Sequence, residues 1–545
     1  MRIGPAAPGP PPAGTQTYVD GTLVLRTVLA GAESLVEVTD FLPLGADGRI
    51  VRRARVLRGP ADISIEVVPG PGATAVHPWS AGVALDGVVV SAGVPFSLRA
   101  VPPPSPARPL RRLVASAEVR LDTGEELVVS IEPRGSYHEP LSPDAARRLE
   151  QRATMTWRRM GGRAGVPGRY GPDAARSALL VAALAGVAGA PVESPATSLP
   201  RIIGGERNRD GRVVAPVTAA AWAEVAAVIG LTEESEAAVR WLVDTLAHEP
   251  PLPSALAPDG GMPGGATVLT TSTGAGGLAG WRRSQPVVSG SDAGDRRSAE
   301  PVAAAIAATA GLARGPSGPS VLSGWPRLVV HADWLAAHWG DPDASVWDDQ
   351  GPDRGWTSPR LATRRALAAA TGEARRRNPL DLDAAEWQTA VRDIERWFRE
   401  TAVGEGGLLR ANVPGAAYAA LARVASWGPW PADDPVTRAT LAHIGTRLGN
   451  GPWLTPYSEE LDDGLPGSEP ASVVATLWFA RALAATNRWD EAHERMEAAI
   501  DLGGPLHLLP ESIDPTRRAA LGNRPSAAAH VAFLQAAVAL SAAPS

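Results

Sequence analysis

The sequence of 545 residues contains no cysteine and no lysine. Without cysteine the chain can form neither disulfide bonds nor thiolate nucleophiles nor Cys-ligated zinc sites. Its nine histidines are scattered, with no H-E-x-x-H motif and no His pair at helical spacing. The sequence therefore predicts no metal site and no cofactor. All basic residues are arginine, which together with abundant Ala, Gly and Pro is typical of a GC-rich genome.

Long apolar runs and a surplus of positive charge are also lacking. No run approaches the ~18 apolar residues of a membrane span, and residues 1–16 have no apolar segment of a secretion signal. We therefore expect a cytoplasmic protein without a membrane partner. The net charge of -6 argues against nucleic acid as a partner. The pattern indicates no particular oligomeric state.

Aromatic residues are few except for tryptophan, with 17 Trp against five Phe and five Tyr. Only Trp79 precedes residue 150. Tryptophan faces in the later part of the chain are suitable platforms for sugar rings. The alternative is that these side chains simply fill the core and fix helix contacts.

The first part of the chain has the pattern of β-structure. Short alternating or β-branched runs such as ADISIEVVP are separated by Gly, Pro and Asp, and DTGE joins two of them as a hairpin. Regularly spaced short strands predict a β-sandwich. We expect this domain to span residues 1–133, and two alternatives stay open for its start: a misassigned first residue or a sandwich without its first strands.

The rest of the chain has the pattern of helices. Residues 134–172 are expected to form a helical linker, and residues 173–545 a helical domain. Twelve segments show apolar residues at helical spacing: 173–189, 217–229, 233–247, 299–313, 326–338, 359–371, 384–400, 415–427, 435–448, 469–486, 489–501 and 526–542. Twelve helices behind a sandwich predict an (α/α)6 toroid, so the fold class is mainly α with an N-terminal β domain. An α-solenoid is the competing interpretation, although no repeat of fixed period supports it.

Several segments in fixed order carry a resemblance to a known family. They are LVLRTVLAG, VEVTDFLPL, PATSLPRIIGGERNRDGR, LAGWRRSQPV, SVWDDQG, LDDGLPGSEPA, LLPESIDP and LGNRPSAAAH. Together they resemble the bacterial glucoamylase, glucodextranase and trehalase-like proteins of glycoside hydrolase family 15, from about residue 18 to the C-terminus. The resemblance implies the same sandwich and toroid, and an α-glucan, oligosaccharide or trehalose as substrate.

The resemblance also implies an inverting, exo-acting α-glucosidase with two carboxyl groups. One protonates the leaving oxygen, and the other activates a water from a position roughly 6.5–9.5 Å away. The acid motif falls on Trp347 and Asp348, and the base motif begins at Glu511. Asp349 is implied as a contact to the sugar. The alternatives are a solvated acidic loop around Asp348 and an ordinary surface acid at Glu511.

The resemblance fails in part of the sugar-binding motifs. The Arg-Asp pair that grips the sugar falls on Val217 and Thr218, Pro456 stands where an Arg is expected, and Arg524 and Ser526 replace Phe and Gln. Each lost charged hydrogen bond removes about 1.5–3 kcal/mol, so we expect weaker sugar binding. The residues that still match imply a pocket lined by Asp210, Arg212, Trp281, Trp347, Glu469 and His530.

Two main hypotheses follow from the sequence. In the first, the chain is an active glycosidase with altered specificity, with Asp348 as acid and Glu511 as base. In the second, it is a catalytically degenerate, carbohydrate-binding or regulatory member of the same fold, as the replacements at Val217 and Thr218 favour. A phosphorylase on a similar plan would need a Gly-rich phosphate loop opening a helix, and the sequence offers no clear one.

Overall fold

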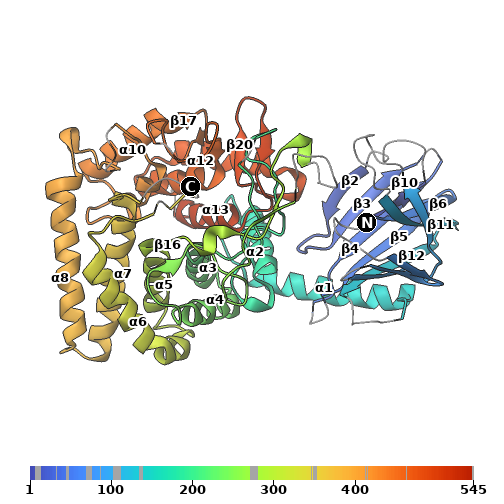
Figure 1. Cartoon of the computed structure of the whole chain (residues 1–545), viewed down its shortest axis with the longest axis horizontal. Helices are drawn as coiled ribbons and strands as arrows, with labels where there is room; N and C mark the ends of the chain where they lie inside the picture. Colours follow the sequence, from blue (N-terminus) through green and yellow to red (C-terminus); the bar gives the residue numbers. More distant parts are fainter. Residues whose placement is uncertain are drawn as a thin grey trace. The chain divides into compact units, whose positions relative to one another are not determined.

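The computed structural model divides into two compact units. Unit 1 holds the described residues up to Gly162, and unit 2 holds those from Arg163 onward. The structure describes residues 1–6, 14–31, 33–44, 48–68, 76–85, 88–101, 112–133, 139–205, 207–269, 280–344, 346–347, 353–411, 413, 415–461 and 463–542. In Figure 1 the strands of unit 1 are blue to cyan, and the helices of unit 2 run from turquoise at α2 to red.

Unit 1 is a sandwich of two antiparallel sheets followed by one long helix. The smaller sheet has the order β1-β6-β11-β10 and the larger one β2-β3-β4-β5-β12-β9-β8-β7. The strands are β1 (Arg2–Pro5), β2 (Gly14–Tyr18), β3 (Leu25–Ala30), β4 (Leu35–Phe41), β5 (Ile50–Arg58), β6 (Ala61–Val67), β7 (Val76–Trp79), β8 (Gly82–Leu85), β9 (Val88–Ser91), β10 (Ser97–Val101), β11 (Arg112–Leu121) and β12 (Glu126–Pro133). The helix is α1 (Pro143–Arg163).

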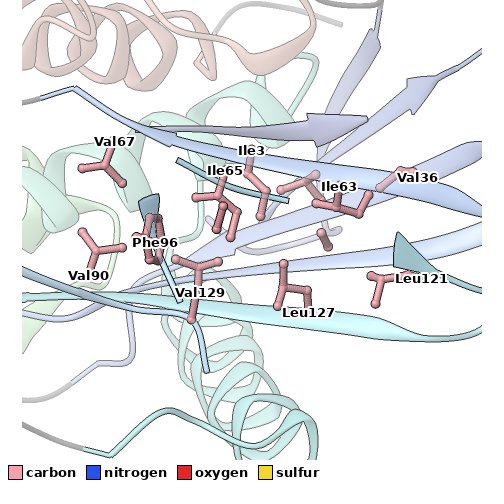
Figure 2. Close-up of a cluster of buried hydrophobic side chains, with 14 of the residues drawn as sticks. Ile3, Val36, Ile63, Ile65, Val67, Val90, Phe96, Leu121, Leu127 and Val129 are labelled. Atoms are coloured by element: carbon pink, nitrogen blue, oxygen red, sulfur yellow. The ribbon is translucent and has the colours of Figure 1, made fainter. Parts of the chain in front are cut away.

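The alternation in the sequence explains how the two sheets share one core. In β6 every second residue is buried, including Ile63, Ile65 and Val67, because successive side chains of a strand point to opposite faces. Figure 2 shows these side chains together with Leu127 and Val129 of β12 in one apolar cluster. The predicted β-sandwich is confirmed.

Unit 2 is a closed double ring of helices. The inner members are α3 (Pro216–Val228), α5 (Ala299–Gly311), α7 (Thr357–Arg377), η6 with α9 (Ala419–Arg423, Val424–Trp427), α11 (Val473–Ala485) and α13 (Ala527–Leu540). Each inner member contacts the next, and α13 contacts α3, which closes the ring. The outer members are α2 (Gly171–Ala185), α4 (Thr232–Thr245), α6 (Gly318–His338), α8 (Leu382–Trp397), α10 (Pro435–Leu448) and α12 (Trp489–Gly503).

Composition separates the inner helices from the outer ones. Helix α5 reads AEPVAAAIAATAG and is buried on nearly every side, as expected for a helix that is apolar all round. Helix α4 reads TEESEAAVRWLVDT and buries only one face. The closed ring confirms the predicted toroid and excludes the solenoid.

Two predicted helices differ from the structure. Helix α6 begins at Gly318 rather than near Pro326, which lies inside it; Pro319 takes the first-turn position that suits proline. Residues 415–427 do not form one helix. Tyr418 pairs with Tyr457 in an extended bridge, so only a 3-10 turn and one short α-helix follow.

Short strands cluster at the amino ends of the inner helices. A five-stranded sheet has the order β17-β18-β19-β20-β21. Its strands are β17 (Gly449–Asn450), β18 (Trp453–Leu454), β19 (Ala471–Ser472), β20 (Ser512–Asp514) and β21 (Ala519–Leu521). Strand β19 leads directly into α11. Among the described residues, no helix is long and apolar enough to cross a membrane.

Candidate active site

Glu511 lies at the amino end of β20, against the start of an inner helix. Its carbonyl accepts a hydrogen bond from the Val473 amide at 3.1 Å, at the first residue of α11. Its own amide donates to the Asn523 carbonyl at 3.2 Å. The backbone on both sides of Glu511 is therefore tied to the inner ring.

The Glu511 carboxylate is held at both oxygens. Arg209 donates to Oε1 from Nε at 3.2 Å and from Nη2 at 3.0 Å, and the Asn523 amide donates to Oε2 at 3.2 Å. Its side chain is only 7% exposed. A guanidinium and an amide both complement a carboxylate, so these partners fix the orientation of the Glu511 side chain.

Two neighbours fix the place of this carboxylate. Asn523, fully buried, accepts the Leu199 amide at 3.1 Å and donates to the Arg209 carbonyl at 2.9 Å, and so joins the segments that hold Glu511. Gly522 has a φ of +72°, and a Cβ there would come within 2.7 Å of Glu511 Oε2. Only glycine allows this close approach at that backbone angle.

A second buried carboxyl lies beside Glu511. The Thr218 hydroxyl and the Ala215 amide hydrogen-bond to Glu193, while its Oε1 has no partner in the described part of the chain. Burial raises the pKa of Glu193 to about 7, and the negative charge of Glu511 adds to this, whereas Arg209 and Thr218 oppose it. A carboxyl with a raised pKa thus stands near the carboxyl that Arg209 and the Asn523 amide hold.

Glu193 is the main feature that the sequence analysis missed. It lies in a stretch of small and apolar residues, GAPVESPATS, where an isolated acid is unusual. Its backbone links two parts of the site, because its amide donates to the Val213 carbonyl at 2.7 Å and its carbonyl accepts the Ala527 amide of α13 at 2.8 Å. Thr218, which stands where an acid was expected, is therefore in contact with an acid from another segment.

Glu469 belongs to a buried ion network near this end of the ring. Arg201 donates to its Oε1 at 2.8 Å, and Arg207 donates to its Oε2 at 2.5 Å. Arg207 also binds Asp463 at 2.6 Å, and the Tyr457 hydroxyl donates to Asp463 as well. These contacts hold the loop before β19 against residues 201–207, and sequence analysis had not identified Arg207 or Asp463.

Asp210 and Arg212 form an ion pair with each other. Asp210 Oδ2 accepts Arg212 Nη2 at 2.6 Å and the Gly290 amide at 2.9 Å, and Oδ1 accepts the Arg212 amide at 3.0 Å. Both oxygens of the buried Asp210 are therefore occupied. Arg212 is half-exposed and also donates to the Ser289 hydroxyl at 3.1 Å.

His530 is fully buried in α13 rather than facing open space. Its ring contacts the Ser177 hydroxyl at 3.0 Å and accepts the Leu509 amide at 3.2 Å. Burial lowers the pKa of His530 well below its ordinary value, and the nearby His507 adds to this, so the ring is neutral. It holds the backbone two residues before Glu511.

The tryptophans of the predicted pocket lie in different settings. Trp281 is 44% exposed and lies under the Arg282 guanidinium. Trp347 packs against Trp478 of α11, with ring centroids 5.2 Å apart. Asp348 and Asp349, which follow Trp347 in the sequence, lie outside the described residues. Within the described ranges, no group of three or more His, Asp or Glu side chains is arranged to hold a metal ion.

The sequence is similar to bacterial and archaeal trehalases. Trehalase of Mycolicibacterium smegmatis is 26% identical over 581 aligned residues, which cover 99% of this chain and 84% of the relative. Trehalase of Thermoplasma volcanium is 25% identical over 394 residues, covering 71% of this chain and 61% of the relative. No family model matches the chain.

The fold is similar to those of glucoamylases. A bacterial glucoamylase complexed with acarbose superimposes with a TM-score of 0.69 at 11% identity, over 97% of this chain and 86% of that one. A glycoside hydrolase family 15 glucoamylase from Hypocrea jecorina has a TM-score of 0.50 at 12% identity, over 68% of this chain and 73% of that one. The similarities support a divergent protein of the glycoside hydrolase family 15 type, and the chain has the sandwich and toroid of the glucoamylase fold.

Proposed function

We propose that the chain hydrolyses the α-glucosidic bond of trehalose, or of a similarly small α-glucoside, with inversion at the anomeric carbon. Glu511 acts as the general base that activates water, and Asp348 acts as the general acid that protonates the leaving oxygen. The observation that carries the proposal is the Glu511 carboxylate itself, held by Arg209 and the Asn523 amide at the rim of a closed ring. The near full-length similarity to a trehalase supports trehalose as the substrate.

Glu511 and Trp347, the residue before Asp348 in the sequence, contact the same inner helix. Glu511 is bonded to Val473 at the start of α11, and Trp347, next to Asp348, packs on Trp478 of that helix. Five residues separate Val473 from Trp478, which is roughly 7.5 Å along a helix axis. One residue of each motif thus contacts the same inner helix, which supports assigning the two motifs to one site.

Glu193 brings a carboxyl next to Thr218, the position at which the resemblance implied an aspartate that this chain lacks. It hydrogen-bonds to Thr218, and Arg209 lies within its electrostatic reach. An acid and an arginine from neighbouring segments thus stand near the place implied for the Arg-Asp pair. They are suited to bind adjacent sugar hydroxyls, because a carboxyl and a guanidinium together offer hydrogen-bond acceptors and donors at one place.

The direct test is glucose release by the purified chain and by Glu511→Gln. Trehalose, maltose, isomaltose and maltooligosaccharides are the substrates to compare. Removing a general base typically costs 10²–10⁴-fold in rate, so we expect a loss of about that size on the substrate that is cleaved. The exposed Glu459→Gln, the same substitution at a surface glutamate, is the matched control.

Two outcomes would contradict the proposal. One is Glu511→Gln with the activity of the wild type. The other is a wild-type chain that binds trehalose in calorimetry but releases glucose from none of the four substrates, which is the result expected of a carbohydrate-binding member.

A further inference from the structure

A narrow cavity lies inside the ring of inner helices. It encloses about 50 Å³, enough for a few waters at roughly 10–15 Å³ each, or for one small polyatomic ion. All six inner members contribute to its wall. The lining residues are Val217, Ala220, Ala221, Glu224, Ala304, Arg365, Ala422, Arg423, Ser426, Trp427, Trp478, Arg481, Ala482 and Gln535.

Part of the cavity lies deeper along the ring axis than the Glu511 cluster. Glu511 is bonded to the first residue of α11 and Glu193 to the first residue of α13. Arg481 and Gln535 are each eight residues further along those helices. At 1.5 Å per residue this is roughly 12 Å, so Arg481 and Gln535 lie deeper than Glu511 and Glu193, while Val217 and Trp478 of the same wall adjoin the proposed site.

The charges around the cavity do not balance. Arg365 forms an ion pair with Glu224, and Arg423 forms one with the buried Glu300. In the described part of the structure the Arg481 guanidinium makes no ion pair and no hydrogen bond. Burial lowers the pKa of Arg481, opposed by Glu224. Three guanidiniums and two carboxylates leave one positive charge without a partner.

Gln535 and the two tryptophans of the wall indicate which kind of ligand the cavity can bind. The Gln535 side chain makes no hydrogen bond to any described residue, so its amide is a second available donor. Both tryptophans already have two neighbours at their rings. Arg423 lies 4.4 Å from the Trp427 ring and 4.8 Å from the Trp478 ring, Arg365 lies 5.0 Å from the Trp427 ring, and the Trp347 ring lies 5.2 Å from that of Trp478. A sugar therefore finds no free aromatic platform here, whereas an anion finds unpaired donors.

We propose that this axial cavity binds a small oxyanion, with the Arg481 guanidinium and the Gln535 amide as its principal donors and Arg365 nearby. The class comprises ions of the size of sulfate, phosphate or a carboxylate. A guanidinium presents a planar fork of donors that matches two oxygens of such a group. The bound ion would neutralise the one unpaired charge in the ring.

The test uses the full chain with sodium sulfate and, separately, sodium acetate, each titrated at constant ionic strength against sodium chloride. We expect one or both anions to raise the unfolding temperature along a saturable curve, because a ligand that binds only the folded state stabilises it by mass action. A saturable response to sulfate alone identifies a tetrahedral ion, and one to acetate alone identifies a carboxylate. Linear, unsaturating responses to both overturn the proposal.

Salts that are excluded from the protein surface stabilise any folded protein, and variants distinguish this effect from anion binding in the cavity. In Arg481→Met the saturable part should disappear, and in Arg438→Met, an exposed arginine of α10, it should remain as in the wild type. Without added anion, Arg481→Met should unfold at the wild-type temperature or above, because it removes an unpaired buried charge. If that variant does not fold, Gln535→Leu takes its place and should weaken the saturable part; identical curves in variant and wild type overturn the proposal.

Discussion

We expect the Glu193→Gln variant to be more stable than the wild type at alkaline pH and to lose this advantage as the pH falls. Burial raises the pKa of Glu193 to about 7 from an ordinary value of 4.5. The folded state therefore holds a proton on Glu193 that the unfolded state releases at lower pH. Stability falls as the pH rises from 4.5 to about 7, and the penalty is then constant. Glutamine keeps the shape and carries no charge, so it removes this dependence.

The magnitude follows from the same two values. A pKa difference of one unit corresponds to 1.36 kcal/mol, so the full penalty on the wild type is roughly 3 kcal/mol above pH 7. Part of it is already present at pH 5.5. Between pH 5.5 and pH 8 the free energy of unfolding of Glu193→Gln should gain about 2 kcal/mol over that of the wild type.

Urea unfolding at pH 5.5 and pH 8 measures this difference. Tryptophan fluorescence reports on unit 2, because only Trp79 and Trp157 of the 17 tryptophans lie in unit 1. The exposed Glu459→Gln is the control and should differ from the wild type equally at both values of pH. A difference between Glu193→Gln and the wild type that does not change with pH, or that shrinks as the pH rises, would refute the electrostatic reasoning.

Two further predictions concern the same end of the ring. Gly522→Ala should lower kcat by about a hundredfold, because its Cβ displaces Glu511 by a fraction of an ångström or more. The control is Gly451→Ala, where the φ of +59° is similar and the added Cβ meets open space. Equal kcat values in the two variants would contradict the prediction. Burial lowers the pKa of His507 to about 4, so the wild type should lose stability as the pH falls below 6.5. Asparagine suits the φ of +49° at position 507. His507→Asn should therefore abolish about 2 kcal/mol of the stability that the wild type loses between pH 7 and pH 5. Thermal unfolding at both values of pH measures this, and a variant with the same pH dependence as the wild type would contradict it.

The fold could be predicted from the sequence because its signals are local. Alternation in strands such as β6 and apolar spacing in helices such as α4 depend on neighbours in the chain. The number of helical segments behind the sandwich indicated the double ring. The start of α6 was wrong because proline suits the first turn at either of two nearby positions, Pro319 and Pro326.

The site was less predictable because its contacts join distant segments. The base motif singled out Glu511, but its partner Arg209 lies 302 positions away and does not differ in local pattern from other arginines of that stretch. Glu193 meets Thr218 only after folding. His530 matched a pocket motif, yet its burial between Ser177 and Leu509 depends on two elements that are far from it in sequence.

The anomeric form of the first glucose released tests the central claim most directly. In α,α-linked trehalose, inversion at one anomeric carbon yields one β-glucose, while the leaving half keeps its α configuration. Proton NMR within the first minutes of turnover should therefore show α- and β-glucose in equal amounts, and Glu511→Gln should show neither. Release of α-glucose alone would mean retention, and would contradict a water activated by Glu511.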